Sequence, residues 1–356
     1  MKHTQTNHRH LAKKYLSHPT FPFEVNPKDS VAATLRKMGK TSFQGRNLAT
    51  VFEIWLDMLK DDTTIFLGLS GAMTAGGMKA IVRYLIQNRF IDCLVSTGAN
   101  LFHDIYESFG SHHYQGSPEA DDVELKELWI DRVYDTYCNE LTFREIDSWV
   151  GNFAYNKLDL TRSYTTREFF YLLGQEVSKR SKVEGMLTAA YKAKVPVYSP
   201  AVGDSSIGIG IATYQKEAFR RFQFDVIGDV QETAYIAARS PNTGVIYLGG
   251  GTPKNFIQQA EVTASIHMGM EAPGHKYAVQ ITADAPHWGG LSGCTFEEAQ
   301  SWGKIHKKAR MATVYADVTL GLPIIAQALA QEGLKYARRR KKPVFEMNQK
   351  LGMRFR

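Results

Sequence analysis

Cysteine is scarce in this sequence. Only Cys93, Cys138 and Cys294 occur among 356 residues, and they stand far apart. An odd number at wide spacing predicts neither a disulfide framework nor a paired zinc motif. Free thiols are typical of a reducing compartment.

Long hydrophobic runs are also missing. The longest nearly apolar stretch, 318–330, is too short to span a bilayer and contains Gly321, Pro323 and Gln327. Residues 1–19 have no apolar core and so do not resemble a signal peptide. We therefore expect a cytoplasmic protein with no membrane partner.

A basic surface over the main body is absent as well, although the net charge is +7. Nine Lys or Arg against one acid lie between Gly333 and Arg356, including the run 338–342. Such charge runs are usually solvated and loosely ordered. We expect a basic C-terminal tail at 336–356, and no nucleic-acid partner.

What the sequence does contain is an alternation of strands, polar turns and helices. Patterns typical of helices cover Met78–Asn88 and Leu101–Phe109, and an aromatic-rich helical insertion is predicted at 123–194. Short β-branched runs separated by helices predict an α/β fold with a doubly wound, mostly parallel, Rossmann-like sheet. Strands are predicted at 64–69, 91–95, 195–198, 245–248, 277–281 and 313–316.

One domain accounts for this pattern. We expect an N-terminal tail at 1–25 and a single domain at 26–335, since no linker or repeat divides it. The run 169–173 is aromatic and apolar, which predicts a core or a subunit interface.

Small polar residues follow nearly every predicted strand. Gly, Ser, Thr, Ala, Asn and Asp let backbone N–H groups approach a pyrophosphate, and the next helix N-terminus favours its charge. Ligands bind at these strand ends in such folds. The turns therefore predict a nucleotide crevice, although no strict Gly-x-Gly-x-x-Gly motif is present and Gly39-Lys-Thr41 lacks the leading glycine of a phosphate loop.

Metal chemistry has little support. His103, His112 and His113 do not form a paired-ligand spacing with a carboxylate, so we expect no metal.

Lys304 is a candidate nucleophile, because it follows Trp302 by two residues and Glu298 by six. A nucleophilic lysine must be neutral, and an apolar wall favours that form. On spacing alone a solvated lysine remains the commoner explanation.

Motifs spread over about 38–331 resemble deoxyhypusine synthases, in particular the divergent bacterial deoxyhypusine synthase-like proteins. The most specific are Ser301–Ile305 and Val314–Asp317. The others are Ile65–Gly68, Arg83–Gln87, Thr97, Pro200 with Asp204, Leu248–Gly251, Tyr277–Val279, Ser292–Gly293 and Glu298.

The resemblance implies an NAD-dependent transfer of an aminobutyl group from a polyamine such as spermidine. It makes Lys304 the nucleophile that carries the group as an imine, with the Trp302 ring along the methylene chain and Glu298 at a cationic amine. The remaining substrate positions that it implies are His103, Asn255, Gly289 and Ser292. The cofactor positions are Gly71, Ala72, Ala75, Thr97, Gly98, Ala99, Asp204, Gly250, Ala283, Asp284, Asp317 and Val318.

The family also implies a homotetramer with the active site at a subunit boundary. The aromatic helices between Phe143 and Tyr171 offer apolar surface for such contacts.

Several positions depart from the family pattern. Ile209 and Leu291 stand where eukaryotic enzymes place acids, and His103 stands for a glutamate and Trp288 for an aspartate. Asn255 and Gln259 replace a histidine and an asparagine. Because asparagine cannot shuttle protons near neutral pH, we expect His287 or His103 to take that role. Fewer carboxylates also predict weaker binding of a polycation.

Three functions remain open. The first is aminoalkyl transfer to a protein lysine, and the second is homospermidine-type synthesis with a small amine as acceptor. The third is a non-catalytic NAD-binding protein. NAD-dependent protein deacylases usually carry a paired-cysteine zinc module, which this chain lacks.

Overall fold

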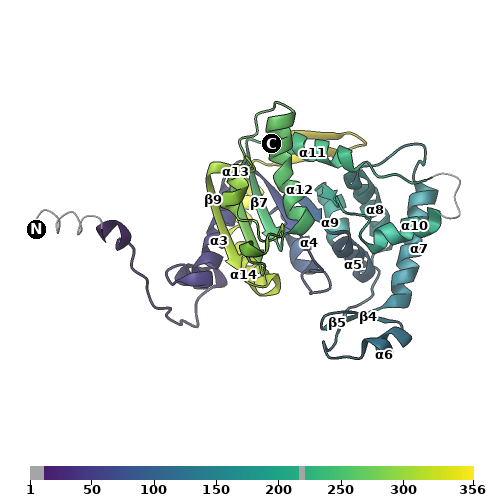
Figure 1. Ribbon diagram of the computed structural model, residues 1–356, viewed down its shortest axis with the longest axis horizontal. Coiled ribbons are helices and arrows are strands. Elements are labelled where there is room, and N and C mark those ends of the chain that lie inside the picture. The colour runs from purple at the N-terminus through teal and green to yellow at the C-terminus, as the bar shows by residue number, and fades with distance from the viewer. Residues whose placement is uncertain (1–11, 216–220) are drawn as a thin grey trace, which may run out of the picture.

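The computed structural model describes residues 12–215 and 221–356. Residues 1–11 of the predicted N-terminal tail lie outside the described residues. Residues 12–28 are exposed and extend away from the rest of the chain (Figure 1). One backbone hydrogen bond, from Phe21 N to Lys40 O at 2.9 Å, ties this arm to the folded part.

A six-stranded parallel sheet forms the centre of the molecule, in the order β6-β2-β1-β7-β8-β9. The chain starts at β1, adds β2 and β6 on one side, and then adds β7, β8 and β9 on the other. The direction of winding therefore reverses between β1 and β7, which is where such folds bind ligands. The strands are β1 Thr63–Leu69, β2 Cys93–Ser96, β6 Val197–Tyr198, β7 Asn242–Leu248, β8 His275–Thr282 and β9 Ile305–Tyr315.

Alternate residues of the strands face two separate cores. On β1, Ile65, Leu67 and Leu69 belong to the first core and Phe66 to the second. This period of two follows from the pleat of a strand, and both faces need apolar side chains because helices cover both. The predicted doubly wound α/β sheet is thus confirmed.

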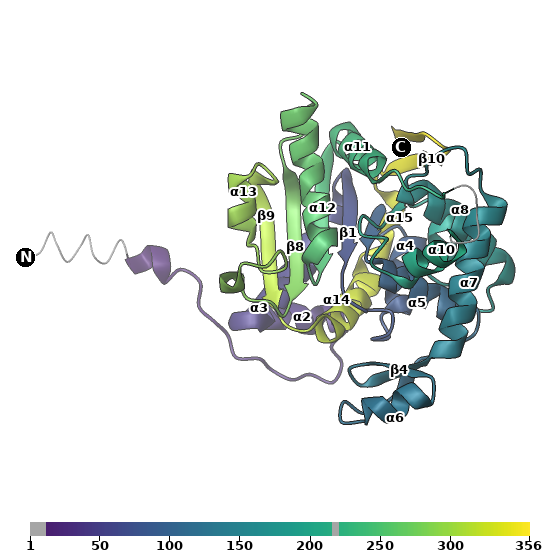
Figure 2. The same ribbon diagram turned by 45° about the vertical axis from the view of Figure 1, so that its right-hand side comes forward.

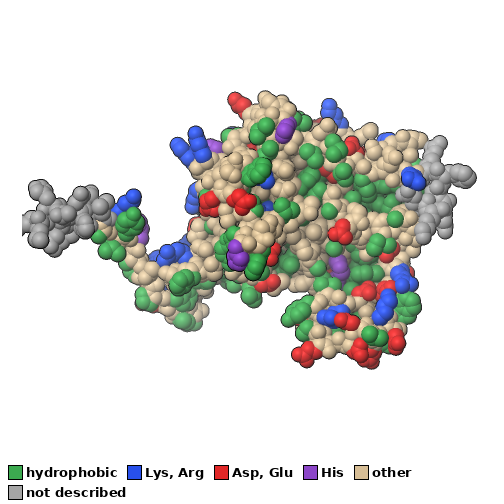
Figure 3. All heavy atoms as spheres, in the orientation of Figure 1, with side chains coloured by type: hydrophobic (Ala, Val, Ile, Leu, Met, Phe, Trp, Pro, Cys, Tyr) green, Lys and Arg blue, Asp and Glu red, His purple; other side chains and the backbone are tan. Residues whose placement is uncertain are grey.

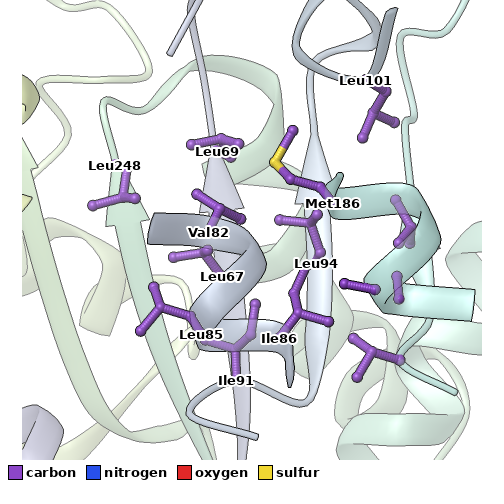
Figure 4. Packing of buried hydrophobic residues seen from close by; sticks show 14 of the residues in the cluster. Leu67, Leu69, Val82, Leu85, Ile86, Ile91, Leu94, Leu101, Met186 and Leu248 are labelled. Atoms are coloured by element: carbon purple, nitrogen blue, oxygen red, sulfur yellow. The ribbon is translucent and has the colours of Figure 1, made fainter. Parts of the chain in front are cut away.

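Helices pack on both faces of the sheet (Figures 1 and 2). Figure 4 shows the first core, where Leu67 and Leu69 of β1 face Val82 and Leu85 of α4. Helices contributing to this core include α2 Val31–Met38, α3 Phe43–Lys60, α4 Lys79–Gln87 and α14 Val318–Glu332. The second core lies under α11 Val226–Arg239, α12 Gly251–Val262 and α13 Phe296–Ser301. A π-helical turn, Thr263–His267, extends α12, and a 3-10 turn occupies Pro286–Trp288.

The insertion after β2 is helical, as predicted, but it also carries a small antiparallel sheet that the sequence did not reveal. Strands β3 Tyr114–Gln115, β5 Thr136–Asn139 and β4 Ile130–Val133 pair in that order. With α6 Asp122–Glu127 they form a projection that is rich in charged side chains (Figure 3). The larger helices are α5 Gly98–Ser108, α7 Glu140–Lys157, α8 Thr166–Arg180, α9 Met186–Ala193 and α10 Ser206–Gln215.

The aromatic helices of this insertion pack within their own chain. Phe153 is 5% exposed, Phe169 is fully buried and Phe170 is 1% exposed. Phe169, Phe170 and Leu173 are therefore core, whereas Tyr171 and Leu172 are partly exposed, and the contact of these helices with another subunit stays a prediction.

The expectation of a loosely ordered basic tail at 336–356 is also wrong. Helix α15 Leu334–Arg339 leads into an antiparallel hairpin of β10 Pro343–Met347 and β11 Leu351–Phe355. Phe345 and Leu351 belong to the second core, which explains why the segment is ordered despite its charge. In the described part of the chain no helix is both long and apolar enough to cross a membrane.

Candidate active site

The turns that follow β1 and β7 meet at the reversal of the sheet. The Ser70 hydroxyl donates a hydrogen bond to the Gly250 carbonyl across this junction. Gly71, Gly249 and Gly251 have φ values of +67°, +76° and +54°. Only glycine adopts such values at little cost, so the junction is lined by backbone rather than side chains. A crevice of this kind can receive a dinucleotide.

Asn100 joins the turns after β1 and β2. Its side-chain amide donates to the Gly71 carbonyl at 3.0 Å, and its carbonyl oxygen accepts from Thr74 N at 2.9 Å. Thr97, the N-cap of α5, donates to the same Gly71 carbonyl at 2.9 Å. Asn100 is fully buried and fixes both loops, yet the sequence analysis did not identify it.

The loop after β6 packs directly on the start of α5. A Cβ at Gly98 would lie 2.4 Å from the Ser205 hydroxyl, so this position requires glycine. Asp204 is exposed in the same loop. Asp317 caps α14 by accepting from Thr319 N at 2.8 Å, and Asp284 is exposed after β8. All the predicted cofactor positions thus lie at the carboxyl edge of the sheet.

Lys304 lies elsewhere. It precedes β9, and its backbone carbonyl accepts from His275 N at the start of β8. The side chain is 9% exposed and reaches toward α12, where Nζ donates to Asn255 Oδ1 at 3.1 Å. The Trp302 ring centroid is 5.6 Å from Nζ. The structure therefore brings Lys304, Trp302 and Asn255 together.

Both contacts of Lys304 line one cavity of about 530 Å³ between α11 and α12. Leu291 and Gln259 line it too, so with Asn255 three of the departures from the family pattern face this space. No carboxylate is among its described lining residues. The remaining lining residues are Val230, Thr252, Phe256, Val262, Thr263 and His267. His267 was not singled out from the sequence, because an exposed histidine carries no pattern.

Ser292 and Gly289 belong to the loop beside this cavity. Ser292 Oγ accepts from Gly251 N at 3.0 Å, and a Cβ on Gly250 would lie 2.3 Å from Ser292 Cα. Gly289 is exposed with φ of +71°, next to Trp288. Glu298 is exposed on α13, and no ion pair joins it to Lys304 within the described residues.

A second lysine supports the loop. Lys254 is 1% exposed, and its Nζ donates to Gln280 Oε1 at 2.8 Å and to the Cys294 carbonyl at 2.6 Å. Burial lowers the pKa of Lys254 to about 8. It links β8 to the loop that carries Leu291 and Ser292, a role that the sequence did not reveal.

His103 lies apart from Lys304, on α5. Its Nδ1 is 2.8 Å from His113 Nε2, and His113 Nδ1 is 2.7 Å from Glu107 Oε1. Burial, together with His113, lowers the pKa of His103 to about 4. His287 contacts Trp288, with ring centroids 4.3 Å apart.

Acidic side chains lie near Ile209, the other position where the family pattern has an acid. A cavity of about 490 Å³ between α7 and α10 is lined by Ile209, Asp131, Glu140 and Asp147, among others. Burial raises the pKa of Asp147 to about 6, and Oδ1 of Asp147 has no hydrogen-bond partner among the described residues.

Comparison with known proteins shows the family to which the chain belongs. The deoxyhypusine synthase family model matches residues 33–329. "Probable deoxyhypusine synthase 2" of Methanosarcina mazei is 48% identical over 331 residues, which cover 92% of this chain and 93% of that protein. The "Deoxyhypusine synthase-like protein" of Coxiella burnetii (strain Dugway 5J108-111) is 38% identical over 301 residues, covering 83% and 84%.

A solved structure shares the fold. It is a crystal structure of a "putative deoxyhypusine synthase" from Entamoeba histolytica, with a TM-score of 0.60, 16% identity, and coverage of 88% of this chain and 97% of that one. Sequence and fold lead to one assignment: the chain belongs to the deoxyhypusine synthase family.

Proposed function

We propose that this chain is an NAD-dependent aminoalkyl transferase in which Lys304 carries the transferred group as an imine. The observation that supports it most is the environment of Lys304: a nearly buried amine beside an aromatic ring, with both of its side-chain contacts lining a cavity.

NAD fits the crevice at the reversal of the sheet. The backbone-lined junction at Gly71 and Gly250, the close approach at Gly98, and the N-termini of α5, α12 and α14 suit a pyrophosphate. Asp204 and Asp317 can accept hydrogen bonds from ribose hydroxyls. When bound there, NAD supplies an acceptor for the hydride removed from the carbon beside the donor amine.

The remaining steps are carried out or supported by side chains of the described residues. The ε-amine of Lys304 forms a bond to the oxidised carbon of the donor, and the smaller amine leaves. A second amine then takes the group as the bond to Lys304 breaks, and the resulting imine regains the hydride that was removed first, so there is no net oxidation. Asn255 Oδ1 holds Nζ in position, and the Trp302 ring offers an apolar surface and a π face to a cationic chain.

A small amine is one acceptor that the cavity suits. Its volume of about 530 Å³ accommodates a polyamine, and it has no carboxylate to pair with several charges. Homospermidine-type synthesis is therefore our second candidate, beside transfer to a protein lysine.

The test is chemical trapping. The purified chain is incubated with NAD and individual polyamines, treated with borohydride, and mapped by peptide mass spectrometry. Label should appear on Lys304, be absent from Lys304→Ala, and persist in Lys307→Ala, which removes an exposed lysine nearby. Label on another lysine, with Lys304→Ala still active, contradicts the proposal.

A further inference from the structure

Three ionisable side chains form a partly buried chain of hydrogen bonds. His103 and His113 are joined at 2.8 Å, and His113 and Glu107 at 2.7 Å. His103 is 8% exposed, and the His113 side chain is 7% exposed. The ring centroids of the two histidines are 5.0 Å apart. Water is thus largely excluded from the contact between them.

The direction of these hydrogen bonds follows from the carboxylate. Glu107 can only accept, so His113 donates from Nδ1. A neutral His113 then has a bare Nε2, which accepts from Nδ1–H of His103. Neutral His103 is left with a bare Nε2, and this atom makes no hydrogen bond in the described part of the chain. The chain therefore ends in a proton acceptor.

The two ends face different spaces. His113 and Glu107 line a cavity of about 650 Å³ that includes Lys79. On the other side, the His103 ring contacts Phe143 at 5.2 Å between centroids. Phe143 lines the separate cavity of Ile209 and its three acids. The His103 ring contacts one lining residue of each cavity, His113 and Phe143.

A carboxylate lies beside His113, whereas burial and His113 lower the pKa of His103. Glu107 and Lys79 lie next to His113, with Lys79 Nζ 3.4 Å from Glu107 Oε2. Although burial opposes it, the hydrogen bond from His113 and the charge of Lys79 lower the pKa of Glu107, so a carboxylate is present. The other ionisable groups facing this region are Arg83, Asp104, Tyr106, His112, Tyr114, Asp135, Glu184, Asp131, Glu140, Arg144 and Asp147.

We propose that Glu107, His113 and His103 form a proton relay that removes a proton from an ammonium group bound on the Phe143 side of His103. It rests on the proposed function, in which an amine must lose a proton before it can attack. The N–H bond of the ammonium breaks as its proton binds His103 Nε2. His103 Nδ1–H passes its proton to His113 Nε2, and the positive charge remains on His113 beside Glu107. His103 is neutral before and after the transfer.

The hydrogen-bond directions can be measured without any substrate. Long-range ¹H–¹⁵N spectra of the full chain, labelled at histidine and assigned with His112→Gln and His113→Gln, should show His103 protonated at Nδ1 and bare at Nε2 at neutral pH. A proton on Nε2 of His103 would overturn the relay.

Steady-state kinetics with spermidine and putrescine as substrates provide the second test of the relay. His113→Gln and Glu107→Gln should lower kcat by about 10- to 100-fold at neutral pH. The deficit should shrink as the pH approaches about 10, because more of the amine is then already neutral. His112→Gln removes an exposed histidine from the same cavity and should have little effect. A deficit that is constant with pH indicates only a structural role and overturns the proposal.

The two proposals fail in different ways. Borohydride labelling of Lys304 decides the transferase reaction and does not need the relay to be fast. The NMR experiment decides the relay even if no polyamine is turned over. Labelled Lys304 with a protonated His103 Nε2 rejects the relay alone.

Discussion

Leu291 lines the cavity beside Lys304 at a position where the family pattern has an acid. We expect Leu291→Asp to lower the KM for spermidine by roughly three- to tenfold, because a partly exposed ion pair is worth on the order of 1 kcal/mol. Steady-state kinetics at low and high salt measures this, and salt should reduce the gain. Leu320→Asp, at an exposed position on α14 outside this cavity, is the matched control. An unchanged KM would show that position 291 does not contact the amine.

Lys254 predicts a specific dependence of stability on pH. Its pKa falls from 10.5 in the unfolded chain to about 8 in the fold, because burial penalises the charge. The unfolded state therefore binds more protons between these values, and the contribution of Lys254 to stability rises as the pH rises through that window. Below a pH of about 8, Lys254 is charged in the fold, so the full free-energy cost of burying its charge applies.

The check compares Lys254→Met with wild type in urea unfolding. The stability of wild type relative to the variant should be greater at pH 10 than at pH 7 by on the order of 2 kcal/mol. Lys307→Met, at an exposed site, should show no such difference. A relative stability that does not change with pH would mean that Lys254 keeps its ordinary pKa in the fold.

At the scale of single residues, the sequence identifies functional residues that belong to a recognisable motif. It does not identify residues whose role comes only from a contact with a distant part of the chain. Lys304 and Trp302 belong to a recognisable segment, and the structure places them together. Asn100 and Lys254 do not, because their contacts are with turns 26 to 40 residues away. Nothing local distinguishes a lysine that binds a distant carbonyl from one in solvent.

The C-terminal element depends on one arginine of a charged run. Arg340 is 8% exposed and donates to both carboxylate oxygens of the fully buried Asp92 at 2.8 Å, and to the Thr63 carbonyl at 2.7 Å. Arg340→Met leaves Asp92 with less compensation and should cost about 3–5 kcal/mol of unfolding free energy. Arg339→Met, at an exposed neighbour, should change it by less than about 0.5 kcal/mol.

Chemical denaturation of the two variants measures the difference. Equal stabilities would show that the Arg340–Asp92 pair does not hold the segment. The run 338–342 looked uniformly solvated in the sequence because charge alone does not show which member finds Asp92, 248 residues away.

The strands of the sheet were predictable to within a few residues because they are buried on both faces and hence apolar throughout. Thr63–Leu69 has this composition. The start of β9 was missed, since 305–309 is interrupted by a register shift and mixes charged with apolar residues. The small sheet of β3, β4 and β5 was missed for a similar reason: it is largely exposed, so it has no apolar alternation.

On the scale of the whole molecule, the proposed active site consists of two parts, the crevice at the strand ends and the cavity beside Lys304. Lys304 makes no hydrogen bond or ion pair with the crevice turns in the described chain, although Thr252 and Leu291 of its cavity are the chain neighbours of Gly251 and Ser292 at the crevice. Large apolar side chains near the cavity are exposed, and such surface marks an interface. They are Val226, Ile227, Ile266, Met268, Trp288, Leu291 and Trp302. This surface is a second candidate for the subunit contact, beside the aromatic helices.

We therefore expect a homo-oligomer, with a tetramer by light scattering, in which one chain's crevice faces another chain's Lys304. Mixing Lys304→Ala with Asp204→Ala by co-expression tests this. In a two-fold interface a mixed pair contains one site without either substitution, so about a quarter of wild-type activity should return, while each variant alone stays inactive. Asp317→Ala serves as a second crevice variant. If both sets of residues act within one chain, no mixture can restore activity.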